Sequence, residues 1–207
     1  MAMLSLTASA QCDRTNTAFR AGESLTYDLY FNWKFIWVKA GSASYRISSA
    51  KYNGKDALRT DLLFKSNKRC SSVFPMKDTL ISYMTPTLTP LYFRKGALEG
   101  KRYTVDEVWY SYGGGKSSLK QKFLDRHGKI HNTTHSSAEC NYDMLSILNV
   151  ARSFDATNYK PGHRILFPMA TGKKVEEQIL IYKGKEEFEA NDDVTYRCLV
   201  FTLLDYE

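Results

Sequence analysis

The sequence predicts a mainly β protein: a curved, largely antiparallel sheet, shaped as a half-barrel or a barrel, with one packed α-helix around residues 142–154. Three observations lead to this prediction. Alternating apolar residues recur along most of the chain, turn residues separate these runs, and a single segment has helical spacing instead. Short strands that follow one another at intervals of about 8–12 residues are typical of all-β barrels and sandwiches.

The first strands lie between Phe19 and Ser48. Successive strand side chains point to opposite faces, so apolar residues at every second position predict a half-buried strand. These residues are Leu25, Tyr27, Leu29 and Phe31. A second strand is predicted from Phe35 to Ile47 because the segment is rich in aromatic and β-branched residues and lacks proline. Gly41 inside it indicates a bulge, or a place where another element packs close to the backbone.

Aromatic residues gather where these two strands meet, at Trp33, Phe35 and Trp37. We interpret them as sheet packing, and an aromatic binding platform is the alternative. Further along, Asn53-Gly54 favours a tight hairpin turn because both residues accept positive φ. Other turns are predicted at residues 113–115, 125–129, 170–172, 183–185 and 191–193, and a loop is predicted at 68–76.

The segment from Tyr142 to Phe154 has helical spacing, and Asn141 or Asp143 can cap its start. We expect this helix to close the open side of the sheet. We predict that Met144, Leu145, Leu148 and Ala151 are buried, and that Asn149, Arg152 and Ser153 face solvent or the rim. Truncating Leu148 should then cost about 2–5 kcal/mol, and truncating Arg152 under about 1 kcal/mol.

Bulk composition limits the class of protein. A length of 207 residues suits one domain, which we place at residues 11–207. The net charge of +7 is spread over several lysine clusters. Neither a nucleic-acid-binding motif nor one continuous basic helix accompanies it, so we expect no nucleic-acid partner. No apolar run reaches the roughly 20 residues of a membrane span, so we expect no transmembrane segment.

The first ten residues resemble the end of a signal peptide, since Ala8-x-Ala10 precedes Gln11 as a small-residue cleavage pattern. We therefore expect an exported protein, periplasmic or associated with the cell envelope. Export permits disulfides, and the four cysteines allow three complete pairings. Cys70 and Cys140 lie beside turn-like segments and are the preferred pair, whereas Cys198 is expected to be a buried apolar residue.

Catalytic and metal-binding motifs are missing from the sequence. His127, His131 and His135 lie four residues apart, but glycine and threonine between them favour strand, where that step spans about 13 Å. Three ligands of one zinc ion cannot be that far apart. The adjacent acids Asp106-Glu107 point to opposite faces of a strand. We predict no catalytic residues, no metal site and no cofactor, and we favour a binding protein over an enzyme.

Three stretches carry a resemblance to a known family. The pattern F-x-x-G-E-x-L-x-Y from Phe19, followed by a strand ending in Ala40-Gly41, resembles the start of the bacterial exported domain-of-unknown-function 3108 family. MKDTLISYMTPTLTPLYF and YDMLSILNVARSFD resemble its middle. The resemblance implies a curved antiparallel sheet around one helix and no known activity. It also implies further strands after Glu207, so we expect the domain to be truncated at its C-terminal end.

These observations favour a non-catalytic module that binds or carries an apolar or amphipathic ligand, such as a lipid, between the sheet and its helix. The alternative is a structural or interaction domain that contacts an envelope protein or a glycan. A hydrolase of envelope polymers is a third hypothesis. The residues expected to line the cavity or to pack the helix are Leu25, Tyr27, Leu29, Phe31, Met144, Leu145 and Leu148.

Overall fold

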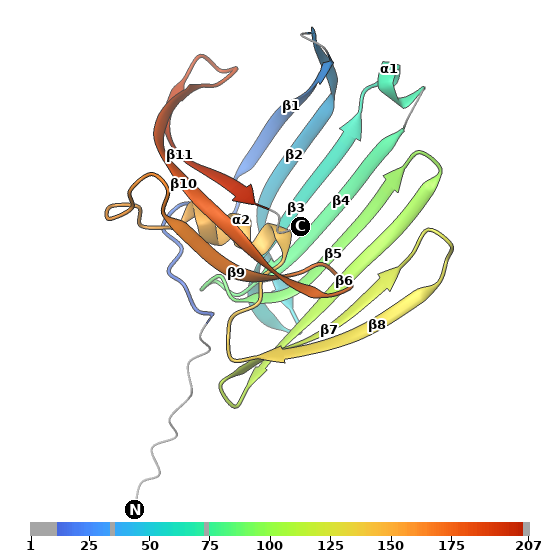
Figure 1. Cartoon of the computed structure of the whole chain (residues 1–207), viewed down its shortest axis with the longest axis vertical. Coiled ribbons are helices and arrows are strands. Elements are labelled where there is room, and N and C mark those ends of the chain that lie inside the picture. Colours follow the sequence, from blue (N-terminus) through green and yellow to red (C-terminus); the bar gives the residue numbers. More distant parts are fainter. Residues whose placement is uncertain (1–11, 34–35, 73–74, 205–207) are drawn as a thin grey trace, which may run out of the picture.

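The computed structural model describes residues 12–33, 36–72 and 75–204, without the side chains of residues 31–33, 36 and 37. Eleven strands and two helices form this part of the chain, and Figure 1 shows their arrangement. The strands are β1 (Ser24–Trp33), β2 (Ile36–Tyr52), β3 (Lys55–Ser66), β4 (Met76–Met84), β5 (Pro90–Glu99), β6 (Arg102–Gly113), β7 (Lys116–Leu124), β8 (Ile130–Ser137), β9 (Arg164–Ala170), β10 (Val175–Glu189) and β11 (Thr195–Leu204). The helices are α1 (Lys68–Ser71) and α2 (Met144–Arg152).

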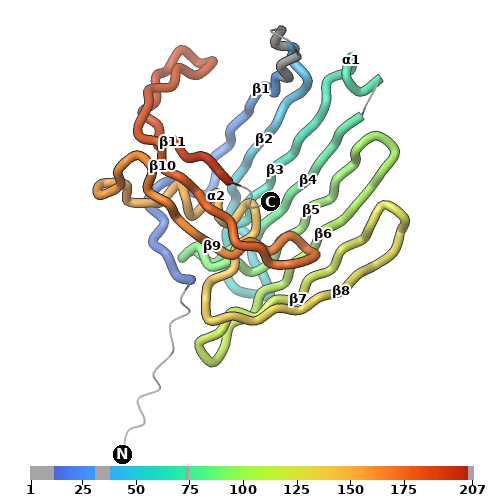
Figure 2. Tube along the Cα trace, viewed as in Figure 1, coloured from blue at the N-terminus to red at the C-terminus, as the bar shows by residue number. Residues whose placement is uncertain are grey.

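The strands form two antiparallel sheets, which confirms the prediction of a mainly β, antiparallel fold. The first has eight strands in the order β1 to β8, so each strand pairs with its neighbours in sequence, and Figure 2 follows this path from blue to yellow. The second has the order β11-β10-β9. Within the described residues β1 and β8 do not pair with each other, so the closed barrel among the expected shapes was wrong.

Two sequence signals set the geometry of β2. Asn53 and Gly54 both have positive φ, 49° and 79°, and join β2 to β3 in the expected two-residue turn. At Gly41 the pairing register of β1 and β2 shifts, and a Cβ there would collide with the carbonyl oxygen of Lys65 on β3. The prediction of a bulge or a close backbone approach at Gly41 is confirmed, because both occur.

Two local predictions were wrong. The turn expected at residues 183–185 is the middle of one continuous strand, β10, whose register against β11 shifts between Tyr182 and Gly184. Gly184, with φ of 129°, supplies a bulge that bends the strand without ending it. The loop expected at 68–76 begins with α1, because the Asn67 side chain accepts a hydrogen bond from the Cys70 amide and caps a short turn of helix.

Helix α2 lies between the two sheets (Figure 1) and contributes to two apolar clusters. Leu145 packs among residues of the eight-stranded sheet such as Leu80, Phe93 and Val108. Val150 belongs to a second cluster that also holds Phe167 of β9. We call the face of the eight-stranded sheet that carries Leu80, Phe93 and Val108 the helix-facing side. Tyr142 joins the helix to the other sheet through a parallel bridge to Met169.

Candidate functional site

The start of α2 is fixed by a buried carboxylate. Asp143 accepts hydrogen bonds from the amides of Leu145 and Ser146 at 3.0 and 2.9 Å, and Ser146 Oγ accepts one from the Asp143 amide at 2.8 Å. This capping box satisfies amide groups that a helix start leaves without partners. The cap is therefore Asp143, one of the two residues that the sequence offered. The hydroxyls of Ser82 and Tyr110 also donate to Asp143 Oδ2, each at 3.3 Å, which ties the helix start to β4 and β6.

A second polar residue holds the middle of the helix on the eight-stranded sheet. Asn149 is fully buried, accepts a hydrogen bond from the Tyr45 hydroxyl and donates one to the Thr60 hydroxyl at 2.8 Å. Most buried polar groups in proteins have such partners, because a buried polar group without one lowers stability. The prediction that Asn149 faces solvent or the rim was wrong, because the sheet presents hydroxyl groups where the apolar pattern suggested a purely apolar contact.

This docking turns the helix away from the predicted orientation. Leu145 is buried as expected, but Met144 and Leu148 are 46% and 43% exposed, so the prediction that these two are buried was wrong. Ile147 and Val150 take their places in the core. The result is an apolar stripe along α2, formed by Met144, Leu148 and the half-buried Ala151, that does not pack into either core cluster.

The stripe faces a cavity of about 690 Å³, which we call the apolar hollow. Its opposite wall comes from the three-stranded sheet, with Phe167 and Met169 of β9, Leu180 of β10, and Leu199, Phe201 and Leu203 of β11. The volume lies in the range of about 300–1,000 Å³ typical of small-molecule sites, which are also mainly apolar.

A second cavity, of about 460 Å³, lies between the stripe and the eight-stranded sheet; we call it the sheet hollow. Leu148 and Arg152 line both hollows. The expected site residues Leu25, Tyr27 and Leu29 of β1 lie on the wall of the sheet hollow, next to Ala43, Tyr45, Leu62 and Phe64. Phe31, the remaining expected residue of β1, has a side chain outside the described residues, as do Trp33, Phe35 and Trp37.

A third cavity, of about 340 Å³, carries charge; we call it the lysine hollow. Met144 and Met169 line both this hollow and the apolar hollow. Its polar residues include Lys95 on β5, Asp106 on β6 and Lys173 in the turn between β9 and β10. Sequence reasoning missed these residues. The only signal was that Lys95 and Asp106 occupy apolar-patterned strands, and their pairing could not be known without the register.

Arg152 occupies the boundary between the apolar and sheet hollows. Its guanidinium donates hydrogen bonds to both carboxylate oxygens of Glu23, at 2.8 and 2.7 Å. The same group lies 5.0 Å from the ring centroid of Phe19 and 5.7 Å from that of Tyr45. Its side chain is only 25% exposed and lines both hollows, so of the two predicted placements, in solvent or at the rim, Arg152 takes the rim.

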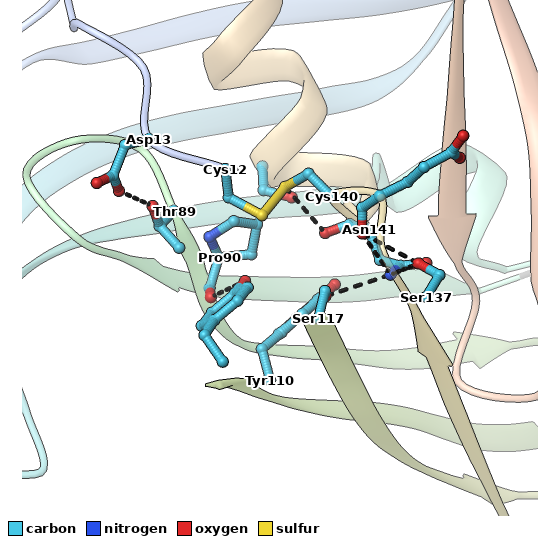
Figure 3. The surroundings of a disulfide bond; sticks show 12 residues. Cys12, Asp13, Thr89, Pro90, Tyr110, Ser117, Ser137, Cys140 and Asn141 are labelled. Atoms are coloured by element: carbon cyan, nitrogen blue, oxygen red, sulfur yellow. Dashed lines mark hydrogen bonds between the residues drawn. A yellow bond between two sulfur atoms is a disulfide. The ribbon is translucent and has the colours of Figure 1, made fainter. Parts of the chain in front are cut away.

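The Cys12–Cys140 disulfide fastens the N-terminal segment beside α2, as Figure 3 shows. The predicted pair, Cys70 with Cys140, was wrong, and Cys70 and Cys198 are free thiols. Next to the bridge, Asn141 donates hydrogen bonds to Ser117 Oγ at 3.2 Å and Ser137 Oγ at 3.0 Å. Cys12 comes from far along the sequence, so neighbouring turns gave no signal for this pair.

The three histidines at four-residue intervals are spread along a turn and strand β8, as expected for an extended segment. His127 and His131 are exposed, and His131 Nε2 lies 2.9 Å from Asp125 Oδ2. Among the residues that the structure describes, no group of three or more His, Cys, Asp or Glu side chains could hold a metal ion. In the same part of the chain, no helix has the length and apolar character needed to cross a membrane.

The fold and its hollows define a class: a mainly antiparallel β protein in which one helix separates two sheets and leaves an apolar stripe facing open space. The chain belongs to the family described as protein of unknown function (DUF3108), whose model matches residues 26–207. Neither the curated proteins nor the solved structures gave a match to this sequence.

Proposed function

We propose that this protein binds, and carries outside the cytoplasm, a ligand with an apolar part that lies along the exposed stripe of α2. The observation that supports this most is the stripe itself. Two large apolar side chains, Met144 and Leu148, are almost half exposed, yet they face a hollow whose other wall is also apolar. Exposed apolar surface of this kind marks binding sites in soluble proteins.

The sheet hollow extends the same surface toward β1, β2 and β3, and Leu148 is common to both spaces. We propose that the eight-stranded sheet curves around the helix as a half-barrel, so that the two hollows form one binding region. An elongated acyl chain fits this shape better than a compact ligand does, because the contacts follow the length of the helix.

Export is part of the proposal. It is supported by the Ala8-x-Ala10 pattern before Gln11 and by the Cys12–Cys140 disulfide, since disulfides persist mainly in oxidising compartments. A carrier in the periplasm or envelope would meet lipids and other amphipathic molecules there.

The test is native mass spectrometry of the protein purified from its host, followed by lipid extraction. We expect a bound amphipathic molecule in the unchanged protein and its loss in Leu148→Glu, because a charge in the apolar hollow would have to lose its hydration. Ile130→Glu is the matched control, since Ile130 is 52% exposed on β8 and belongs to none of the three hollows. Absence of any ligand, or equal retention by both variants, would overturn the proposal.

A second candidate function is a glycan-binding or interaction domain of the envelope. The face of the eight-stranded sheet opposite the helix-facing side carries a row of aromatic side chains, from Tyr52 through Tyr83 and Tyr92 to Trp109. The centroids of neighbouring rings in this row lie 5.4, 6.3 and 5.6 Å apart. The apolar faces of sugar rings pack well on such surfaces. A pull-down from envelope extracts, at low and at high salt, separates the two candidate functions. A retained glycan that the variant Tyr92→Ala releases would favour the glycan-binding domain over the carrier.

A further inference from the structure

The lysine hollow differs from the other two because its wall is charged. It adjoins the apolar hollow across Met144 and Met169, which line both. A molecule lying along the stripe of α2 would therefore place one end at three of the polar residues of this wall. These are Lys95, Asp106 and Lys173.

The geometry of the sheet brings these groups together without pairing them. Lys95 and Asp106 are direct cross-strand neighbours on β5 and β6. Even so, no ion pair within 4.0 Å joins the Lys95 ammonium to a carboxylate among the described residues. Asp106 Oδ1 is buried and has no hydrogen-bond partner in the same part of the chain.

Lys173 is held in place by the turn that carries it. The Gly172 amide donates to Gln121 Oε1 at 3.2 Å, and the Thr133 hydroxyl donates to the Lys173 carbonyl oxygen at 2.9 Å. Gly172, with φ of 87°, sits so close to β6 that a Cβ there would lie 2.5 Å from Asp106 Cβ. The turn is thereby fixed over β6, β7 and β8, and the Lys173 ammonium lies 3.8 Å from the ring centroid of Phe123.

The charges in this hollow do not balance. Lys174 is neutralised by Glu176, whose carboxylate lies 2.6 Å away. That leaves Lys95 and Lys173 with the single carboxylate of Asp106. Burial raises the pKa of Asp106, and the two lysines act against that rise. Even when ionised, this single carboxylate balances only one of the two ammonium groups.

We infer that the lysine hollow holds the anionic head, a phosphate or carboxylate, of the amphipathic ligand, with Lys95 and Lys173 as its hydrogen-bond donors. The inference rests on the proposed function and assigns the chemical class of the ligand. Lysine ammonium groups carry three donors and bind such anions through charge-assisted hydrogen bonds. Asp106 attracts both ammonium groups to the same end of the hollow, and the chain of the ligand lies over Met144.

The experiment compares amphiphiles that share one chain and differ in the head: hexadecyl phosphate, hexadecanoate and the neutral monohexadecanoylglycerol. Displacement of the neutral dye Nile red reports their affinities, and inorganic phosphate alone is a fourth probe. We expect both anionic amphiphiles to bind about tenfold tighter than the neutral one, as one retained charge-assisted hydrogen bond would give. Inorganic phosphate should not displace the dye at the concentrations at which the amphiphiles do.

The double variant Lys95→Gln, Lys173→Gln should lose about that tenfold preference and bind the neutral amphiphile unchanged. Lys120→Gln is the control, because Lys120 is an exposed lysine on the other face of β7. Equal binding of anionic and neutral amphiphiles to the unchanged protein would overturn the head assignment and leave the proposed function standing. Failure of all three amphiphiles to bind would overturn both. Tight binding of inorganic phosphate, lost in the double variant, would make this a phosphate site instead.

Discussion

Arg152, the last residue of α2, forms a two-hydrogen-bond ion pair with Glu23, the residue before β1. About three quarters of each side chain is shielded from solvent, with 25% and 24% exposed. The pair therefore connects the C-terminal end of the helix to the first strand of the eight-stranded sheet. The Arg152 guanidinium also stacks on the rings of Phe19 and Tyr45, which adds contacts that the charge alone would not provide.

Arg152→Ala should therefore lower the free energy of unfolding by about 1–2 kcal/mol, because it removes both a bidentate charge pair and the packing of the arginine stem. Urea denaturation measures the change. Arg46→Ala is the matched control, since Arg46 is exposed on β2, and it should cost under about 0.5 kcal/mol. Equal costs for the two variants would show that the ion pair contributes nothing measurable.

Neighbouring positions on α2 offer a sharper comparison. Asn149→Ala should cost about 2–4 kcal/mol, because it leaves the buried hydroxyls of Tyr45 and Thr60 without their partner. Leu148→Ala should cost under about 1 kcal/mol, since that side chain is 43% exposed. Chemical denaturation of both variants under the same conditions gives the comparison. A larger cost for Leu148→Ala than for Asn149→Ala would contradict the orientation of α2, in which Asn149 is buried and Leu148 is 43% exposed.

The orientation of α2 marks the point where prediction from the sequence failed. Helical spacing correctly located α2, and the pattern of alternation located most strands, because both depend on local periodicity. The face that α2 buries depends on Asn149 meeting Tyr45 and Thr60, which are about a hundred residues away in the sequence. Periodicity ranks leucine above asparagine for burial and has no means of recognising a distant polar partner.

Elsewhere in the chain, too, the correct predictions concern features set by the local sequence, and the wrong or missing ones concern contacts between distant segments. The role of Gly41 was predictable because a glycine inside a strand usually marks a bulge or a close backbone approach. The Cys12–Cys140 pair and the approach of Gly172 to β6 depend on which segments the whole fold brings together. The register that places Lys95 opposite Asp106 has the same origin. The candidate site is built mainly from contacts of this second kind, so only its apolar residues were predictable.

Asp143 makes the stability of the helix start depend on pH. Burial raises the pKa of this carboxyl from its ordinary value of 3.8 to about 6, although the hydrogen bonds from Ser146 and Leu145 oppose the rise. The folded protein then binds the proton more tightly than the unfolded chain does. The contribution of Asp143 to stability is therefore largest below about pH 4 and is lost as the pH rises through 6.

Asp143→Asn keeps a good N-cap residue and removes this titration. Relative to the unchanged protein, the variant should gain about 2 kcal/mol in free energy of unfolding between pH 4.5 and pH 7.5. Urea denaturation of both proteins at the two pH values isolates the effect, because all other groups titrate alike in both. A difference between the proteins that stays constant with pH would show that Asp143 keeps its ordinary pKa.

The Cys12–Cys140 disulfide should be the strongest single constraint on the N-terminal segment. It joins residues separated by 128 positions, and closing a loop of that length restricts the unfolded chain strongly. In the folded protein, Cys12 is 2% exposed, and the nearby Arg14 amide donates a hydrogen bond to the Thr87 carbonyl oxygen at 2.8 Å. The bridge thus keeps this segment against the loop between β4 and β5.

Cys12→Ser should accordingly lower the free energy of unfolding by about 2–5 kcal/mol, and Cys70→Ser, which removes a free thiol, by under about 1 kcal/mol. Thiol labelling of the protein purified from its host adds an independent measurement. We expect two reactive cysteines after denaturation without reductant, Cys70 and Cys198, and four after reduction. Four reactive cysteines without reductant would show that the bridge does not form in the host, and the support that it lends to export would disappear with it.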